Sequence, residues 1–222
     1  MTFLRRGGLP MLGAGLLVLA CGGDGGGGTG PCTPGAATQL VKTGGDAQSW
    51  YFNNPLPAAL SVTARDANNC AVPGVVVNWA VASGGGAVNP TQSATGTTGV
   101  AATADSIGST SPQTVTATFT GLAAPVTFTA TASAPPTSAA VSVNDNVFSP
   151  GSAVIQSGGT VTWTWAGQNI HNLTFTGGPT PQPANQGNQV TGTAQRTLTT
   201  VGSYSYSCTN HFNMNGTVRV VH

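Results

Sequence analysis

The C-terminal half of the chain is organised around one segment, which reads Gly202-Ser203-Tyr204-Ser205-Tyr206-Ser207-Cys208-Thr209-Asn210-His211-Phe212-Asn213-Met214-Asn215-Gly216-Thr217. Its first part alternates, so a strand places Tyr204, Tyr206 and Cys208 on one face and the serines on the other. Cys208 is therefore predicted to point inward at the end of a strand. His211 and Met214 follow in one short loop, with two residues between each sulfur or imidazole donor and the next.

These donors match a known ligand set. Two imidazoles and one thiolate, with a long and weak thioether contact, make a blue-copper electron-transfer site. The second imidazole must come from upstream in the fold, and of the remaining histidines, His222 is the final residue whereas His171 opens a predicted strand. We therefore predict one copper ion held by His171, Cys208, His211 and Met214.

Cys208 also fits two competing roles, in a disulfide and in a zinc site. A tyrosine two residues before a cysteine occurs in immunoglobulin sandwiches, where that cysteine joins an inter-sheet disulfide. Such a bridge would need Cys32 or Cys70 and would leave His211 and Met214 without a role. A zinc site could use the thiolate and two imidazoles, but zinc has little need of a thioether.

Both halves of the chain show the apolar alternation of half-buried strands, separated by turns rich in Gly, Pro and Asn. We predict an all-β protein of two β-sandwich domains, at residues 36–134 and 138–222, with a linker at 135–137. The clearest predicted strands are 60–64, 75–81, 115–119 and 126–130 in the first domain and 140–143, 160–165, 171–175, 196–198, 203–208 and 217–221 in the second.

The second domain resembles the cupredoxins in Val147-Phe148-Ser149-Pro150, Gly159-Thr160-Val161-Thr162-Trp163, His171-Asn172, residues 202–208 and Met214-Asn215-Gly216-Thr217-Val218. The short ligand loop looks most like that of amicyanin within the plastocyanin group. This resemblance implies a Greek-key sandwich that shuttles single electrons between a donor and an acceptor protein. It departs from the family at Phe212, where relatives commonly carry proline.

The same resemblance implies two further roles. Asn172 would stabilise the cysteine loop through hydrogen bonds, and so tune the metal. An edge of His211 would face solvent as the electron portal, with Phe212, Asn213 and the prolines at 179 and 181 around it.

The first domain resembles bacterial immunoglobulin-like domains of the invasin and intimin type, in Pro55-Leu56-Pro57, residues 72–79, Gly84-Gly85-Gly86 and residues 126–132. The resemblance implies a spacer or adhesive module, and we favour a spacer because a single copy is a short stalk. Trp79 is interpreted as a core anchor. Asp66 and Asp105 are expected in turns, where short acids bond to local backbone.

The N-terminus is predicted to direct export. Residues 1–20 combine Arg5-Arg6 with an apolar run, as in a signal peptide, and the run is too short to favour a membrane-spanning helix. Val18-Leu19-Ala20-Cys21 resembles the lipobox of bacterial lipoproteins, which implies a lipid on Cys21 and a membrane-anchored protein facing the periplasm or the cell exterior. An ordinary secretory peptide is the alternative. Residues 21–35 are rich in glycine and are predicted to form a flexible tether.

The sequence contains four cysteines. With Cys21 assigned to lipid and Cys208 to metal, Cys32 and Cys70 are left, and an exported protein meets an oxidising compartment. We therefore predict a disulfide between Cys32 and Cys70.

Charge is scarce, with six basic and five acidic side chains and no glutamate in the whole chain. This excludes a basic surface for nucleic acid. Three histidines are too few for a multicopper oxidase, and no catalytic constellation is present, so an enzyme is not expected. Copper storage or delivery, and a purely adhesive surface protein, remain as alternative functions.

Overall fold

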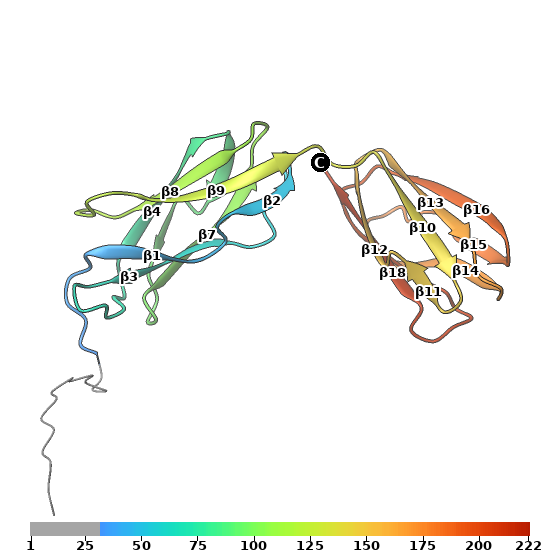
Figure 1. The fold of residues 1–222 in the computed structure, drawn as a ribbon, viewed down its shortest axis with the longest axis horizontal. Coiled ribbons are helices and arrows are strands. Elements are labelled where there is room, and N and C mark those ends of the chain that lie inside the picture. Colours follow the sequence, from blue (N-terminus) through green and yellow to red (C-terminus); the bar gives the residue numbers. More distant parts are fainter. Residues whose placement is uncertain (1–31) are drawn as a thin grey trace, which may run out of the picture. The chain divides into compact units, whose positions relative to one another are not determined.

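The computed structural model describes residues 32–222. All secondary-structure elements in that range are β-strands. Its four sheets form two sandwiches, β1 to β9 and β10 to β18, each with its own hydrophobic core (Figure 1). The predicted all-β class with two sandwiches is confirmed. No helix long and apolar enough to cross a membrane occurs among the described residues. The predicted leader, Cys21 and the first part of the tether lie outside them.

The N-terminal sandwich has one sheet ordered β1 (Gln39–Gly44), β3 (Leu60–Arg65), β7 (Val100–Ile107) and β5 (Gly86–Asn89). The other sheet is ordered β2 (Gln48–Tyr51), β9 (Val126–Ser133), β8 (Gln113–Thr118), β4 (Val76–Ser83) and β6 (Gln92–Ala94). Trp79 and Phe128 meet in the core with ring centroids 5.9 Å apart. Trp79 is thus a core residue, and its indole N–H donates to the Ser93 hydroxyl at 2.9 Å.

The strand β7 is a main feature that the sequence pattern did not reveal. Its inward side chains are Ala101, Thr103, Asp105 and Ile107, which give no apolar alternation. The expectation that Asp105 lies in a turn is wrong, because this residue lies within strand β7 and its side chain is buried. Burial raises the pKa of its carboxyl, and a hydrogen bond from Gln113 partly offsets that rise.

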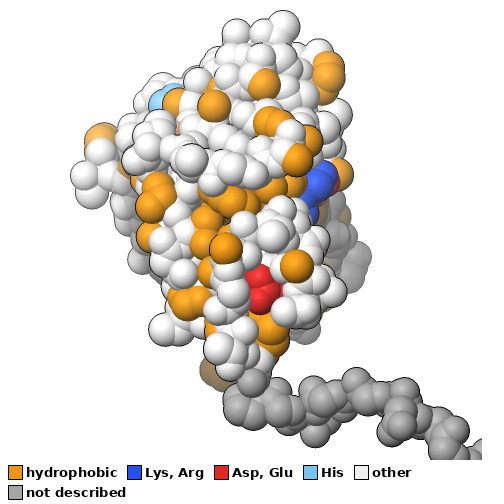
Figure 2. All heavy atoms as spheres, turned by 90° about the vertical axis from the view of Figure 1, so that its left-hand side faces the viewer, with side chains coloured by type: hydrophobic (Ala, Val, Ile, Leu, Met, Phe, Trp, Pro, Cys, Tyr) orange, Lys and Arg blue, Asp and Glu red, His pale blue; other side chains and the backbone are white. Residues whose placement is uncertain are grey.

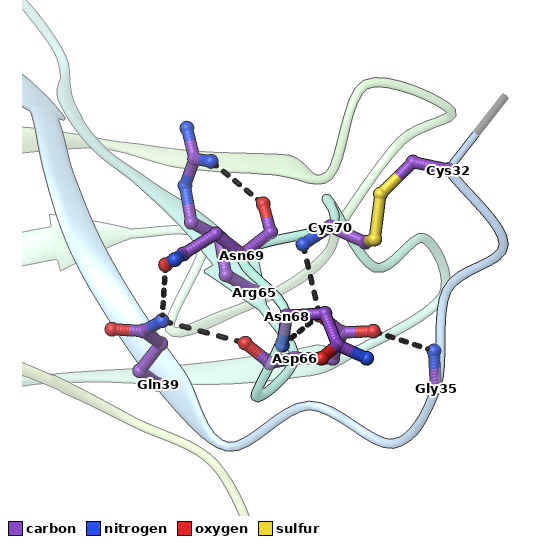
Figure 3. Close-up of a disulfide and its surroundings, with 8 residues drawn as sticks. All are labelled: Cys32, Gly35, Gln39, Arg65, Asp66, Asn68, Asn69 and Cys70. Atoms are coloured by element: carbon purple, nitrogen blue, oxygen red, sulfur yellow. Dashed lines mark hydrogen bonds between the residues drawn. A yellow bond between two sulfur atoms is a disulfide. The ribbon is translucent and has the colours of Figure 1, made fainter. Parts of the chain in front are cut away.

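Asp66 does lie in a turn, beside the disulfide of the N-terminal sandwich (Figure 3). Its carboxylate accepts backbone N–H groups of Gly35, Asn68 and Cys70 at 2.8–2.9 Å. The bond from Gly35 is the main cause that holds the pKa of Asp66 below its usual value. Cys32 and Cys70 are joined as a disulfide with their Cα atoms 5.7 Å apart. The bridge and Asp66 together attach the start of the described chain to the first sandwich.

The C-terminal sandwich has one sheet ordered β11 (Val147–Ser149), β10 (Ser138–Asn144), β13 (Gly159–Trp165) and β16 (Gly192–Leu198). The other is ordered β12 (Ser152–Gln156), β18 (Asn215–Val221), β17 (Gly202–Ser207), β14 (His171–Gly177) and β15 (Gln186–Gln189). Strand β17 alternates between buried tyrosines and partly exposed serines, as its sequence predicts. Its place between β14 and β18 puts the segment that follows it next to both strands.

Aromatic side chains fill the core beneath that segment. Tyr206 packs edge-on against Trp163 and Phe148, with ring centroids 5.4 Å and 4.9 Å away. Such pairs contribute about 0.5–1.5 kcal/mol each beyond their buried area. Residue 216 must be glycine, because a Cβ there would lie 2.5 Å from the Tyr206 hydroxyl oxygen. The core therefore holds the strand on each side of the ligand loop.

Charged side chains are sparse on the surface as well as in the sequence. Figure 2 shows one face of the molecule, on which hydrophobic and uncharged polar atoms cover nearly all of the area. Only small groups of basic and acidic atoms interrupt it.

Candidate metal centre

Three strands bring the candidate ligands to one end of the C-terminal sandwich. His171 is the first residue of β14, and Cys208 directly follows β17. These strands pair antiparallel, with Thr174 opposite Ser207, so the start of β14 lies beside the end of β17. His211 and Met214 occupy the loop between Cys208 and β18. The strand register therefore brings His171 next to Cys208 and the loop that carries His211.

The donor atoms of three ligands face one another. The sulfur of Cys208 lies 3.8 Å from Nδ1 of His171 and 3.6 Å from Nδ1 of His211. All three donor atoms lie within 4.8 Å of one another. The two imidazole rings are tilted, with centroids 4.4 Å apart. The centre of the group is therefore lined by donor atoms.

The spacing fits a metal ion. Bonds of about 2.3 Å to sulfur and about 2.0 Å to nitrogen, at roughly 110–120°, require the two donors to be about 3.5–3.7 Å apart. The observed sulfur-to-nitrogen separations of 3.6 and 3.8 Å agree with this. A soft thiolate with two imidazoles suits copper, and one buried thioether in the same loop favours copper over zinc.

Met214 closes the ligand loop and is only 1% exposed. The Cys208 N–H donates to the Met214 carbonyl at 3.0 Å, and the Met214 N–H donates to the His211 carbonyl at 3.4 Å. Met214 belongs to the same buried cluster as Cys208 and Tyr206. The loop is thus closed by its own backbone, with its two sulfur-bearing residues buried.

Asn172, on β14, is hydrogen-bonded to this loop. Its backbone N–H points at the Cys208 sulfur at 3.5 Å. Its side chain makes two bonds with Thr209, donating to the hydroxyl at 2.7 Å and accepting the backbone N–H at 3.0 Å. A buried amide with both ends bonded keeps the chain next to Cys208 in one conformation.

Asn188 on β15 is a part of the site that the sequence did not reveal. Its side-chain oxygen accepts from the amide groups of Asn172 at 3.0 Å and Asn210 at 2.9 Å. Asn210 also donates to the Ile170 carbonyl at 3.2 Å. One asparagine oxygen therefore joins β15, β14 and the ligand loop. The segment 186–189 contains no apolar residue, so no sequence pattern marked it as a strand.

Asp145, in the turn between β10 and β11, is the second residue near the site that was not predicted from the sequence. It lies 3.3 Å from Nε2 of His171, the ring nitrogen that faces away from Cys208. The backbone N–H of Asn169 is the main cause that lowers the pKa of the Asp145 carboxyl. One signal was present in the sequence, since Asp145 is the only acidic residue after Asp105.

His211 is the ligand that reaches the surface. It is half-buried and lines an open groove of about 440 Å³ together with Gln168, Asn169, Ile170, Asn188 and Asn210. Phe212, next to it, is 93% exposed. The prolines expected around His211 lie elsewhere, because they follow the other end of β14. Pro181 lines a different pocket with Arg196 and Tyr204, and Pro179 lies against Gly202.

The competing disulfide at Cys208 is not formed. Cys208 is a free, buried thiol, while the other two described cysteines pair with each other. Tyr204, the earlier tyrosine of β17, donates its hydroxyl to the Thr200 carbonyl at 3.1 Å. Tyr206, the tyrosine two residues before Cys208, packs on Trp163 and Phe148. The immunoglobulin-type spacing is therefore present here without a bridge.

Comparison with known proteins adds an independent observation. The model of the family of copper binding proteins, plastocyanin/azurin family, matches residues 136–221. No curated protein matches the chain.

Solved structures similar to the chain include a cupredoxin, an amicyanin and a plastocyanin. A purple cupredoxin from Nitrosopumilus maritimus is 26% identical, over 37% of this chain and 99% of its own, with a TM-score of 0.34. A reduced amicyanin mutant is 25% identical, over 38% and 82%, with a TM-score of 0.33. Oxidised plastocyanin from Dryopteris crassirhizoma is 24% identical, over 37% and 99%, with a TM-score of 0.31.

The family match includes His171, Cys208, His211 and Met214, and the spacing of the thiolate and the two imidazoles fits a metal ion of copper's size. Residues 136–221 therefore form a cupredoxin domain of the plastocyanin/azurin family, with a site for one copper ion.

Proposed function

We propose that the protein is an exported, lipid-anchored blue-copper protein that carries single electrons between two redox proteins. The observation that supports this most is the convergence of one thiolate and two imidazoles within 4.8 Å of one another, in a domain of the plastocyanin/azurin family. We propose a carrier because one thiolate with two imidazoles and a thioether is the ligand set of blue-copper electron-transfer sites.

When bound, copper supplies a one-electron couple between Cu(II) and Cu(I). The chain holds its donors in place for both states, since Cys208 and His171 are buried and bonded to their surroundings. Met214 would offer a weak thioether donor, which helps to set the potential. A rigid donor set keeps the rearrangement between oxidation states small, which favours fast exchange.

His211 would be the route for electrons to and from partners. It is the one proposed ligand that is only half-buried, and it lines the groove beside Phe212 and Ile170. Ile170 is 52% exposed, and the other lining residues are uncharged amides. Partners would therefore dock through apolar and hydrogen-bonding contacts.

The N-terminal sandwich would act as a spacer between membrane and copper domain. In this proposal it is a bacterial immunoglobulin-like domain, and the tether connects it to a lipid on Cys21. Support comes from its well-filled core and from its histidine-free sequence, which offers no metal centre of the same kind.

The electron-transfer proposal is tested with the full-length chain and Cu(II). One equivalent of copper should produce an intense thiolate charge-transfer band in the visible spectrum. The band should disappear on reduction and return on oxidation over repeated cycles, with copper retained. A colourless protein would overturn the proposal, and transfer of the copper to an acceptor chelator during cycling would indicate storage or delivery instead.

The anchoring proposal is tested separately in a bacterial host. Cells given a labelled fatty acid should incorporate it into the protein, and a Cys21→Ser variant should lose both the label and membrane association. A protein that stays unlabelled and is secreted would indicate an ordinary signal peptide.

A further inference from the structure

The carboxylate of Asp145 is placed against the buried imidazole of His171. Its Oδ1 lies 3.3 Å from Nε2, while Nδ1 of the same ring faces the Cys208 sulfur at 3.8 Å. The ring is fully buried, so Nε2 has no access to water. A proton on Nε2 donated to Asp145 leaves Nδ1 unprotonated and free to bind a metal.

The turn around Asp145 is built to hold this carboxylate. Its Oδ1 also accepts the backbone N–H groups of Gln168 and Asn169, both at 2.9 Å. Residue 167 must be glycine, because a Cβ there would lie 2.4 Å from the same oxygen. The segment that leads into His171 is therefore wrapped around the Asp145 side chain.

The backbone of His171 is held on the other side. The indole N–H of Trp165 donates to the His171 carbonyl at 3.0 Å, and this bond is buried. His171 is thus fixed both at its ring and at its backbone.

Among the described residues, the imidazole of His171 is the only side chain that is hydrogen-bonded to the Asp145 carboxylate. Asp145 forms no ion pair with lysine or arginine in that part of the chain. Arg196 directs its guanidinium to the carbonyls of Ala184, Asn185 and Gln195. The single acid of the C-terminal sandwich is therefore directed at a candidate copper ligand.

We propose that Asp145 is a positioning residue of the copper site, which fixes His171 as the Nε2–H tautomer and makes Nδ1 a stronger donor. This inference rests on the proposed copper site and adds a residue to it. A carboxylate that accepts from a metal-bound histidine raises the basicity of the ligand, and loss of such a partner typically costs about 10- to 100-fold in metal affinity. The negative charge also favours Cu(II) over Cu(I), and so lowers the potential.

The first experiment examines the full-length protein without copper, by ¹⁵N-resolved NMR of the imidazole nitrogens. The wild type should show His171 as a single Nε2–H tautomer with a slowly exchanging proton. Asp145→Ala should lose this proton's protection or mix the tautomers. A wild-type Nδ1–H tautomer, or an unchanged Asp145→Ala spectrum, would overturn the positioning role.

The second experiment measures copper affinity, by competition with a chelator, and potential in the loaded protein. Asp145→Ala should bind Cu(II) about 10- to 100-fold more weakly. Asp145→Asn keeps an acceptor oxygen for the loop but removes the charge, so its potential should shift upward with the loop bonds retained. The matched control is Asp46→Asn, which makes the same charge change in the N-terminal sandwich.

The proposal is overturned by two results together: Asp145→Asn has the same reduction potential as the control, and Asp145→Ala binds copper with unchanged affinity. Asp145 would then be only a turn residue. If the wild type binds no copper, the proposed function fails, yet the tautomer measurement still decides what Asp145 does to His171. Circular dichroism of each variant shows whether it is folded.

Discussion

The two sandwiches use buried polar side chains in different ways. Seven buried polar or charged residues lie in the N-terminal sandwich: Asn54, Thr63, Asp66, Thr95, Thr103, Asp105 and Gln113. They are dispersed over strands and turns. In the described part of the C-terminal sandwich only His171 and Asn172 are buried and polar, and both belong to the metal centre. Burying a polar side chain costs free energy. In the N-terminal sandwich the buried polar side chains are distributed through the structure, whereas in the C-terminal sandwich they are concentrated at the metal centre.

The largest expected effect is that of replacing Cys208, the cysteine of the metal centre, compared with replacing a cysteine of the N-terminal sandwich. Cys208→Ser should abolish the visible band of the copper-loaded protein, because the thiolate that gives the charge-transfer transition is gone. Absorption spectroscopy measures this. The matched control is Cys70→Ser, which should keep the band. A band that survives Cys208→Ser would mean that the donors are wrongly assigned.

The disulfide should matter only to the domain that contains it. Replacing both Cys32 and Cys70 by serine removes the closure of a loop with a sequence separation of 38 residues. The expected loss in free energy of unfolding is about 4 kcal/mol on the chain-entropy estimate. Urea unfolding followed by tryptophan fluorescence should report it, and the copper band, recorded in parallel, follows the C-terminal sandwich alone. An equal loss in the copper-band transition would contradict the separation of the two cores.

Asn188 tests whether the polar network of the C-terminal sandwich stabilises the site. Asn188→Ala leaves the amides of Asn172 and Asn210 without a shared acceptor, which should cost about 1–2 kcal/mol in unfolding monitored by the copper band. The control is Gln195→Ala, which removes a hydrogen bond to Thr162 on the other sheet. Equal effects of the two variants would show that Asn188 has no special role.

Asp105 should make the stability of the N-terminal sandwich depend on pH. Its pKa is raised in the folded state, mainly by burial, so the folded protein binds the proton more tightly than the unfolded chain does. Its contribution is complete below the unfolded pKa of about 3.9 and is lost as the pH rises through the folded pKa.

The measurement is the difference between wild type and Asp105→Asn in urea unfolding, at a series of pH values from about 3.5 to about 7. The wild type should lose stability relative to the variant as pH rises. Asp46 and Asp66, whose pKa values are lowered, act in the opposite direction but cancel in this difference. A difference that stays constant with pH would contradict the assignment.

The smallest expected effect is that of salt on electron exchange. The C-terminal sandwich carries only Asp145, Arg196 and Arg219 as charged residues, so its field should steer a partner weakly. The rate of reduction by ascorbate should change by less than about twofold between roughly 0.01 and 0.5 M salt. Stopped-flow absorption at the copper band measures it, and a steep fall with ionic strength would contradict weak steering.

Whether a strand could be predicted from the sequence depended on whether one of its faces is apolar. Strands with an apolar residue at every second position, such as β13 and β17, were recognised because one face of each packs on a core. Strands β7 and β15 were missed because their inward or paired residues are small or polar. The pairing of β14 with β15 is decided by backbone hydrogen bonds and by the Asn188 network, which leave no hydrophobic pattern.

The amino-acid sequence by itself determined the all-β class and the ligand loop of Cys208, His211 and Met214, because alternation and donor spacing are local properties of a chain. Only the tertiary structure decided which residues surround those donors. Asp145 and His171 are 26 residues apart, and Asn172 and Asn188 are 16 apart, and they meet through strand register. Contacts of that kind depend on how strands pair within a sandwich, so they cannot be predicted from the spacing of residues along the sequence.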